Sequence, residues 1–312
     1  MKVLHITNLY PTKKHPTYGI FVKEQIESLK NKDYQDYYFI NAKENGVLAY
    51  FKAFKELKNK IEKYDVIHCH HQFSVLPIFF RSRKKKIILS VLGDINKRNL
   101  INKFIYKIVS KRCEKIIFKN KLPDKTPKFH LLPNGVNSDF FQPSPMKEAR
   151  QFLDLDQNKI YVLFVCNGDL SNPIKRKDKF DSVLNELNRG SQKNRFSELI
   201  MSNVSRDDVS SYYNAANLML VTSEHEGSPN AVKEAMACNL PIVSTPVGDV
   251  MYNLEFVSNC FVTNTHEISE LVNKVKSVDL NARSNSREKI FTLNLDMKSK
   301  AEELKKLYNS LL

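Results

Sequence analysis

Two carboxylates lie on either side of the start of a predicted helix. Glu226 and Glu234 are separated by seven residues, and the segment between them contains Ser228 and Pro229. Serine suits the N-cap of a helix and proline its first turn, so this segment predicts a helix over residues 230–238. The N-terminus of a helix presents unpaired N–H groups and the positive end of the helix dipole. The pattern therefore predicts an anion-binding site with a carboxylate on each side.

Each carboxylate alone has a simpler interpretation. An acidic residue near a helix N-terminus stabilises any helix, which could account for Glu226. Glu234 could be an ordinary solvated residue on the helix surface. The functional interpretation depends on the combination of both carboxylates with the helix start, because that combination is much more specific than either residue.

Short apolar segments rich in β-branched residues alternate with longer segments of helical periodicity. This alternation is typical of α/β proteins with parallel sheets, whose buried strands are apolar throughout. The predicted strands are residues 3–7, 37–41, 66–69, 86–91, 115–118, 129–132, 160–165, 218–222 and 241–244. The predicted helices are residues 21–31, 50–63, 99–112, 177–188, 230–238 and 298–312. Ligands of such sheets bind beyond the carboxyl ends of the strands, where the loop around Glu226 is expected.

The alternation of strands and helices restarts once, which predicts two domains. Residues 133–156 are polar, include glycine and proline, and suit a crossover between domains. A chain of 312 residues is also near the limit for a single hydrophobic core. We expect one domain over residues 1–143 and another over residues 144–296. The last helix, residues 297–312, could pack back on the first domain.

The segment from Glu226 to Glu234 resembles the E-x7-E motif of the retaining glycosyltransferases of family 4. Further segments also fit the family: residues 235–237, Pro241, Gly248, the first glycine loop at 18–22, the histidine strand at 65–70 and the domain linker at 132–136. The resemblance implies the GT-B fold, in which two Rossmann-like domains have parallel sheets facing across a cleft. It also implies transfer of a sugar from a nucleotide diphosphate to an acceptor, with retained anomeric configuration and no required metal.

The resemblance implies a role for each residue of the motif. Glu234 would accept two hydrogen bonds from the ribose hydroxyls of the donor, as an ionised carboxylate can. Glu226 would contact the sugar ring and is a catalytic candidate. Backbone N–H groups would hold the sugar hydroxyls and the diphosphate; the donor-binding candidates here are Gly227, Ser228, Asn230 and Ala231. Negative charge grows on the departing diphosphate, so cations and the helix end would accelerate the reaction.

The sequence departs from the family pattern at the cation of this site. Lys177 occupies the lysine position of the family's R-x5-K-G pattern, and Lys175 and Arg176 precede it. The arginine position holds Ser171, and the glycine position holds Asp178. We expect one of the three basic residues to meet the diphosphate, with Lys177 as the first candidate. Solvated surface charge is the alternative.

Gly19 and His70 are the site candidates of the first domain. The resemblance places Gly19 in a donor-binding glycine loop and gives His70 a catalytic role beside the donor sugar; a strand-end histidine without a role is the alternative. His68 and His71 are expected to face other directions and receive no role. A metal site at residues 68–70 is rejected because strand alternation supplies only two ligands and no nearby Cys or carboxylate completes the set.

The net charge of +15 is located in one half of the chain. Residues 1–145 hold 28 basic and 12 acidic side chains, whereas residues 146–312 hold 21 basic and 22 acidic ones. The first half therefore has a net charge of +16 and the second a net charge of −1. Basic groups are attracted to anionic lipid, so we expect peripheral binding of the first domain to an anionic membrane surface.

The helix over residues 99–112 is predicted to be amphipathic. Its apolar residues recur at i, i+1, i+4 and i+5 and form the side expected to face the core: Leu100, Ile101, Phe104, Ile105, Ile108 and Val109. Lys103, Lys107 and Lys111 lie together on the polar side. A core-facing helix with a solvated basic face is the simpler interpretation, and a membrane-surface helix is the other.

Composition excludes several other classes of protein. The chain is 42% hydrophobic and 27% charged, as in ordinary globular proteins. The longest apolar runs are far shorter than the ~18 residues of a spanning helix. The first residues predict a buried strand rather than a signal peptide. The five cysteines lack C-x-x-C spacing and are expected to be buried thiols in a reducing cytoplasm.

The sequence therefore predicts a cytoplasmic bacterial glycosyltransferase, peripheral on the inner face of the cell membrane. The expected donor is a nucleotide-diphosphate sugar, with a UDP-sugar favoured, and no cofactor or metal is expected. The expected acceptor is a glycan or a lipid-diphosphate-linked glycan of surface polysaccharide synthesis, such as capsule or lipopolysaccharide. A catalytically silent GT-B partner subunit is the alternative. A nucleic-acid-binding protein is less favoured because no nucleic-acid-binding module is found.

Overall fold

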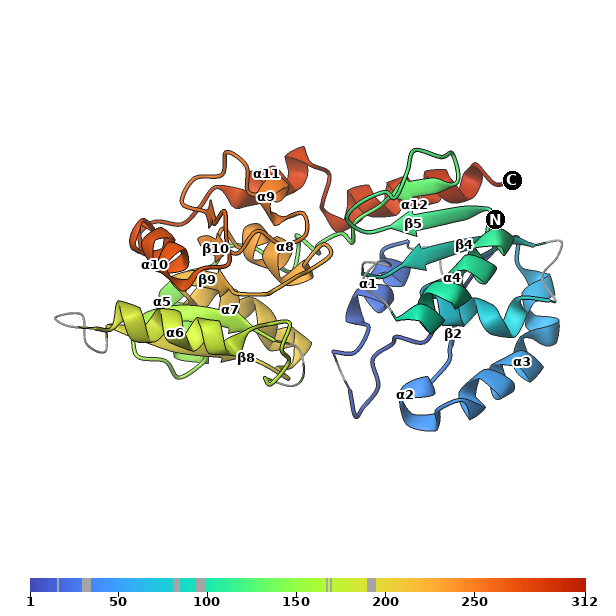
Figure 1. Ribbon diagram of the computed structural model, residues 1–312, viewed down its shortest axis with the longest axis horizontal. Coiled ribbons are helices and arrows are strands. Elements are labelled where there is room, and N and C mark those ends of the chain that lie inside the picture. The colour runs from blue at the N-terminus through green and yellow to red at the C-terminus, as the bar shows by residue number, and fades with distance from the viewer. Residues whose placement is uncertain are drawn as a thin grey trace. The chain divides into compact units, whose positions relative to one another are not determined.

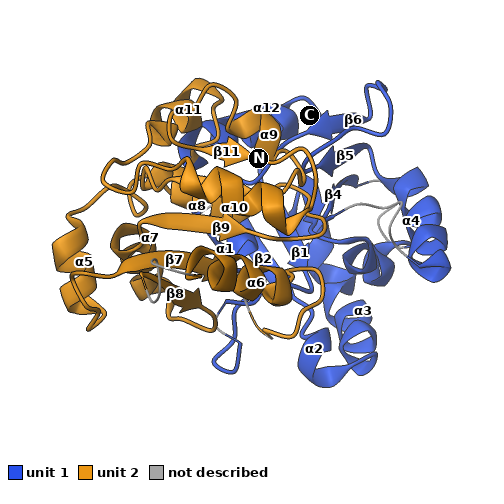
Figure 2. Cartoon of the chain, turned by 60° about the vertical axis from the view of Figure 1, so that its left-hand side comes forward, with its two compact units in different colours: residues 1–135, 297–312 blue, residues 136–296 orange. Residues whose placement is uncertain are grey.

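The computed structural model describes residues 1–15, 17–29, 35–80, 85–93, 99–166, 168, 170–189 and 195–312. The chain forms two compact α/β units, shown in different colours in Figure 2. Unit 1 comprises Met1–Gly135 and Met297–Leu312, and unit 2 comprises Val136–Asp296. The last two residues of the first predicted helix, 30 and 31, lie outside the described residues.

Unit 1 is built on a parallel sheet with the strand order β2-β1-β3-β4-β5-β6. The strands are β1 (Val3–Thr7), β2 (Gln35–Phe39), β3 (Val66–Cys69), β4 (Lys86–Val91), β5 (Lys115–Phe118) and β6 (Phe129–Leu131). The helices are α1 (Ile20–Ser28), α2 (Ala42–Asn45), α3 (Leu48–Lys60), α4 (Leu100–Arg112) and α12 (Met297–Asn309), with 3-10 segments η1 (Ile61–Lys63) and η2 (Gln72–Ile78). The inner strands are buried and mostly apolar because helices cover both faces of a parallel sheet.

Helix α12 belongs to unit 1 although it follows unit 2 in the sequence (Figure 1). Ala301, Leu304 and Tyr308 recur at helical spacing and are buried in one cluster with strand residues such as Val3 and Ile117. The Tyr308 hydroxyl is 2.6 Å from Nδ1 of His68 on β3. The end of the chain is therefore fixed to the first sheet by apolar packing and by one buried polar contact.

The boundary between the units lies at Gly135, before the expected position at residue 143. Val136 and Phe141 are buried in the core of unit 2, and the N–H of Val136 donates to the carbonyl of Leu295 at 2.9 Å. The segment expected to be a polar crossover therefore belongs to unit 2. It also contains α5 (Met146–Phe152), which the sequence analysis did not predict.

Unit 2 is built on a second parallel sheet with the order β11-β10-β9-β7-β8. The strands are β7 (Ile160–Val165), β8 (Phe196–Met201), β9 (Leu218–Val221), β10 (Ile242–Ser244) and β11 (Phe261–Val262). The helices after α5 are α6 (Lys177–Leu187), α7 (Val209–Ala215), α8 (Asn230–Ala237), α9 (Val250–Asn253), α10 (Ile268–Lys276) and α11 (Ser286–Thr292), with the 3-10 segment η4 (Arg206–Asp208). Separate apolar clusters fill the two sides of this sheet.

The cysteines and the lengths of the helices were also predicted from the sequence. All five cysteines are buried, as predicted. None of the helices in the described part of the chain is long and apolar enough to cross a bilayer.

Replacing Tyr308 by phenylalanine should destabilise the protein. The change removes the hydroxyl that contacts His68 and leaves a fully buried imidazole nitrogen without this partner. A buried polar group that loses its partner costs about 1–3 kcal/mol, so the urea midpoint should fall accordingly. Tyr252→Phe is the control because Tyr252 is largely exposed and should leave the midpoint unchanged. An unchanged midpoint for Tyr308→Phe would show that the contact does not stabilise the fold.

Candidate active site

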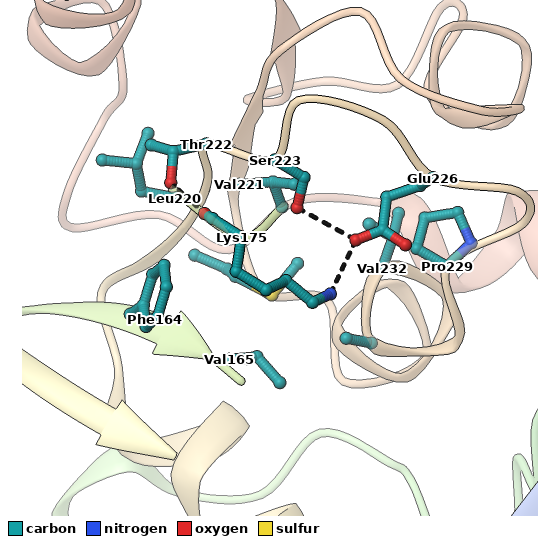
Figure 3. Close-up of a pocket in the computed structure, with 12 residues that line it drawn as sticks. Phe164, Val165, Lys175, Leu220, Val221, Thr222, Ser223, Glu226, Pro229 and Val232 are labelled. Atoms are coloured by element: carbon teal, nitrogen blue, oxygen red, sulfur yellow. Dashed lines mark hydrogen bonds and ion pairs between the residues drawn. The ribbon is translucent and has the colours of Figure 1, made fainter. Parts of the chain in front are cut away.

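The candidate site of unit 2 lies where the strand order reverses. Strand β7 pairs with β8 on one side and with β9 on the other. The two strands that follow β7 in the sequence therefore lie on opposite sides of it. Ligands of doubly wound sheets bind at this point, beyond the carboxyl ends of the strands. A pocket is found there (Figure 3), lined by Phe164, Val165, Lys175, Met219, Leu220, Val221, Thr222, Ser223, Glu226, Pro229, Ala231 and Val232.

A lysine and a glutamate form an ion pair in this pocket. Nζ of Lys175 lies 2.6 Å from Oε1 of Glu226, and Ser223 Oγ donates to the same oxygen at 2.9 Å (Figure 3). The Thr222 hydroxyl bonds to the carbonyl of Lys175 at 3.0 Å, so the lysine segment is fixed to the end of β9. Both members of the pair are site candidates in the sequence, but their contact was not predicted.

Arg176 and Lys177 make other contacts. Arg176 pairs with Asp178 at 2.8 Å and with Glu224 at 3.0 Å. Lys177, the first residue of α6, pairs with Asp181 and lies 3.0 Å from Glu198 on β8. Of the three basic residues, Lys175 is therefore the one that contacts the motif glutamate, whereas Lys177 was the first candidate.

The start of α8 differs in one detail from the prediction. The helix begins at Asn230 as predicted, but its N-cap is Pro229 rather than Ser228, with no capping side chain. The Pro229 carbonyl accepts the N–H groups of Val232 and Lys233. Ser228 Oγ instead accepts a hydrogen bond from the buried Lys233 ammonium at 3.1 Å. Ser228 therefore precedes the N-cap and supplies an acceptor to the buried ammonium, which needs one.

Glu234 is held by two side chains that the sequence analysis missed. Arg206, on η4 after β8, donates to Oε1 at 2.8 Å, and Tyr213, on α7, donates to Oε2 at 2.8 Å. Burial and the adjacent carboxylate raise the pKa of Tyr213, so its hydroxyl keeps the proton that it donates. An ionised carboxylate has about four acceptor positions, so Glu234 can accept further hydrogen bonds. No local sequence signal marks Arg206, because its strand β8 was not predicted.

A glycine lets two loops of this site approach each other. Gly248 has φ of 58°, and a Cβ atom there would lie 2.1 Å from the carbonyl oxygen of Gly227. A side chain at this position would therefore force the Glu226 loop away from the end of β10. Gly248 is required by the close approach of two backbones as well as by its own conformation.

Gly19 of unit 1 is required for a similar reason. It is the N-cap of α1 with φ of 70°, and a Cβ atom there would lie 2.3 Å from the carbonyl carbon of Leu9. The glycine therefore lets the loop after β1 pack against the start of α1. This loop follows the first strand of the sheet, where the order of unit 1 reverses between β1 and β3.

Three buried histidines lie together at this reversal in unit 1. The His68 and His70 rings stack with centroids 4.1 Å apart, and His5 of β1 stacks on His70 at 5.3 Å. The expectation that His68 faces away from His70 is wrong, since residues i and i+2 of a strand lie on the same face. The argument that only two ligands are available to a metal is also wrong, because β1 supplies His5.

Hydrogen bonds link the three histidines to one another and to their neighbours. His5 Nε2 lies 2.8 Å from Gln35 Oε1, and His5 Nδ1 lies 3.0 Å from His70 Nε2. His68 contacts Tyr308 and, at 2.8 Å, the Ser90 hydroxyl. Since the amide oxygen only accepts, His5 Nε2 carries its proton and its Nδ1 accepts from His70. His70 Nδ1 is then the acceptor nitrogen of that ring.

The match to known families covers the candidate site of unit 2. The family model described as Glycosyl transferases group 1 matches residues 154–278. A curated protein described as a probable sucrose-phosphate synthase, from Thermosipho melanesiensis, is 25% identical over 175 residues. That match covers 49% of this chain and 41% of the relative, so it spans about two fifths of the relative's length.

Solved structures are similar over the whole chain. Sucrose-phosphate synthase from Thermosynechococcus elongatus has a TM-score of 0.77 and 16% identity, covering 100% of this chain and 99% of that one. Anabaena HepE in complex with UDP has a TM-score of 0.74 and 15% identity, covering 99% and 100%. HepE in complex with UDP-glucose has a TM-score of 0.70 and 16% identity, with the same coverage.

The two parallel-sheet units define the fold of the GT-B glycosyltransferases, which confirms the predicted fold class. Residues 154–278, which contain Glu226, Glu234 and Lys175, match the model of the group 1 glycosyltransferases. The resemblance noted in the sequence is thereby confirmed at the level of this family.

The histidine cluster should make stability depend on pH. Burial lowers the pKa of His5 to about 4 and holds the pKa values of His68 and His70 well below their usual value. The unfolded chain takes up these protons near pH 6.5 while the folded chain stays neutral, so stability falls as the pH decreases. Between pH 7.5 and 5.5 the loss should be about 1.4 kcal/mol per histidine, measured by urea denaturation.

A His225→Gln variant is the control for this measurement, because it leaves the cluster intact and should show the same slope. An unfolding free energy that stays constant from pH 7.5 to 5.5 would contradict burial of the three rings in the neutral form.

Proposed function

We propose that this protein is a retaining, metal-independent glycosyltransferase that uses a nucleotide-diphosphate sugar, with a UDP-sugar as the favoured donor. The observation that carries the proposal is the Lys175–Glu226 ion pair beside the start of α8, within a group 1 domain. The complexes of HepE with UDP and UDP-glucose support the choice of uridine. The active site would transfer a hexose or a related sugar.

Lys175 would meet the donor diphosphate together with the start of α8. In sugar transfer the bond between the anomeric carbon and a diphosphate oxygen breaks, and a bond to the acceptor oxygen forms. Negative charge then grows on the diphosphate. The ammonium and the helix N–H groups are already in position, so they stabilise this charge without reorganisation of the site. The N–H groups of the first turn, at Asn230 and Ala231, and of the loop at Gly227 would supply the hydrogen bonds.

The two glutamates would then bind different parts of the donor. Glu226 loses its lysine partner to the diphosphate and gains sugar hydroxyls that donate to it. Glu234 keeps Arg206 and Tyr213, which fix its orientation, and accepts the ribose hydroxyls with its remaining positions. A carboxylate held by two partners is pre-organised, so little is lost when the ribose binds.

His70 would contact the donor sugar as a hydrogen-bond acceptor. Its Nε2 is committed to His5, so Nδ1 can accept a proton from a sugar hydroxyl but cannot donate one. His5 and Gln35 act by fixing this tautomer. The glycine loop at Gly19 would lie beside the same ligand.

The proposed acceptor is a glycan or a lipid-diphosphate-linked glycan of bacterial surface polysaccharide, such as capsule or lipopolysaccharide. Its place would be the inner face of the cell membrane, with unit 1 on the anionic surface. The net charge of +16 over residues 1–145 supports this assignment, since both the lipid surface and a diphosphate carrier are anionic.

Nucleotide binding tests the donor proposal directly. UDP should raise the melting temperature by several degrees at saturating concentration, and GDP, ADP and CDP should raise it less, because a ligand that binds the folded state stabilises it. The 2′-deoxy analogue of UDP should act more weakly than UDP, because it lacks a hydroxyl for Glu234. Stabilisation by none of the nucleotides would overturn the donor proposal and favour a silent partner subunit.

Two lysine variants separate the possible diphosphate ligands. Lys175→Ala should lower the rate of UDP release from a UDP-sugar by about 100-fold, since a fixed charge opposite the leaving group is lost. Lys177→Ala is the matched control and should lower the rate by less than about 5-fold, because its ammonium already pairs with Asp181 and Glu198. A larger loss for Lys177→Ala than for Lys175→Ala would reverse the assignment.

A further inference from the structure

Helix α4 exposes most of the apolar side that the sequence predicts to face the core. Leu100, Ile101 and Phe104 are 82%, 70% and 64% exposed. The helix contacts the core of unit 1 through Val109, which is buried, and through partly buried neighbours such as Ile105. The apolar arc of α4 is therefore wider than the part of it that packs on unit 1. The helix turns only one edge of this arc toward the core, whereas the whole apolar side was predicted to face it.

Helix α3 has the same character. Ala49, Ala53 and Leu57 form its buried stripe at i, i+4 and i+8. The opposite stripe carries Leu48 and Phe51, which are 75% and 64% exposed. An ordinary surface helix has polar residues on this side, so the outward apolar residues of α3 need another explanation.

The exposed residues of the two helices belong to one part of unit 1. Segment η2 packs against both α3 and α4, and its Leu76 is also exposed. Figures 1 and 2 show both helices on the same side of unit 1. We call this area the α3–α4 surface; it comprises Leu48, Phe51, Leu76, Leu100, Ile101 and Phe104. Exposed apolar patches of this kind mark interaction sites.

Lysines are interleaved with these apolar residues. Lys52, Lys55 and Lys58 flank the outward stripe of α3, and Lys107 and Lys111 lie on the outward side of α4. The cores of protein–protein interfaces are depleted of lysine, so a protein partner fits this composition poorly. Interfacial membrane helices combine apolar anchors with lysines, whose ammonium groups reach anionic head groups while their stems lie along apolar surface.

The α3–α4 surface is also close to the ligand-binding edge of the first sheet. Helix α3 follows β2, η2 follows β3 and α4 follows β4, so these elements start at the carboxyl ends of parallel strands. Leu48 and Leu100 are the first residues of their helices, and Phe104 lies one turn further along α4. Ligands of such sheets bind at this edge. A membrane bound here would thus be adjacent to the part of unit 1 that binds a ligand.

We infer that the α3–α4 surface inserts its apolar side chains into the interface of an anionic lipid bilayer. The inference rests on the membrane partner proposed above and specifies how unit 1 would bind it. Lysines provide the attraction to anionic lipid, and the aromatic and leucine side chains enter the boundary between head groups and acyl chains. An acceptor carried by a lipid would then meet unit 1 at the edge of its sheet.

The absence of tryptophan from the chain permits a direct test of insertion. Phe104→Trp and Phe152→Trp each introduce a single tryptophan, which can be excited selectively, at a phenylalanine that is 64% exposed; the first is on the α3–α4 surface and the second on α5 of unit 2. With vesicles containing phosphatidylglycerol, the emission of Phe104→Trp should shift to shorter wavelength and be quenched by brominated acyl chains. Phe152→Trp should show neither change. Equal behaviour of the two variants would overturn the inference.

Vesicle flotation tests the energetic contribution of the surface. The double variant Leu100→Gln and Phe104→Gln should bind phosphatidylglycerol vesicles about 10-fold more weakly than the unmodified protein, whereas Phe152→Gln should bind equally well. Lys107→Gln with Lys111→Gln should weaken binding several-fold at low salt, and Lys159→Gln on unit 2 is the control. Unchanged melting temperatures confirm that the variants are folded.

The remaining outcomes separate this inference from the proposed function. If the lysine variants lose binding but Phe104→Trp shows no shift, the attraction is electrostatic only and insertion is overturned. If the unmodified protein does not bind anionic vesicles, the membrane partner itself is overturned, while stabilisation by UDP without lipid would still support sugar transfer. If the Leu100 and Phe104 variant changes a dimer into a monomer in sedimentation, the surface joins two copies of the chain and the inference is wrong.

Discussion

The parallel pairing of β7 with both β8 and β9 is the constraint on which the candidate site depends. Because β8 and β9, which follow β7 in the sequence, lie on opposite sides of it, the loops after β7 and β9 separate and leave a pocket at their carboxyl ends. The lysine segment follows one strand and the glutamate loop follows the other. The contact of Lys175 with Glu226, 51 residues apart, is thus a product of strand order. The same order places His5 beside His68 and His70 in unit 1.

The charges of the site in unit 2 are paired before any ligand is considered. Lys175 pairs with Glu226, and Arg206 pairs with Glu234, in surroundings that leave each of these side chains a quarter exposed or less. A partly buried charge without a partner is costly, so removing one member of either pair would destabilise the site. An anionic donor can exchange one partner for another at little electrostatic cost, because its diphosphate replaces a carboxylate beside the lysine. The site is therefore suited to a ligand that carries both anionic groups and hydroxyls.

The central strands could be predicted from the sequence, whereas the edges and several contacts could not. Strands β1, β3, β4, β5 and β7 begin and end as predicted because apolar residues dominate each of these short runs. The missed strands, β8 and β11, lie at the edges of the second sheet, where partial exposure removes that signal. The motif glutamates were found through their spacing around a helix start. His5 and Arg206 were missed because only the neighbouring strand or loop reveals that they contact His70 and Glu234.

Helix α4 shows how far periodicity can determine the orientation of a helix. Its residues define an apolar arc, but periodicity does not tell which part of a wide arc the core will cover. Unit 1 covers the edge that contains Ile105 and Val109 and leaves Leu100 and Phe104 outside. An excess of apolar surface is unfavourable in water, and the anionic bilayer proposed above would supply both hydrocarbon and negative charge. That proposal would give the basic charge and the exposed apolar residues of unit 1 a single physical explanation, which neither feature provides alone.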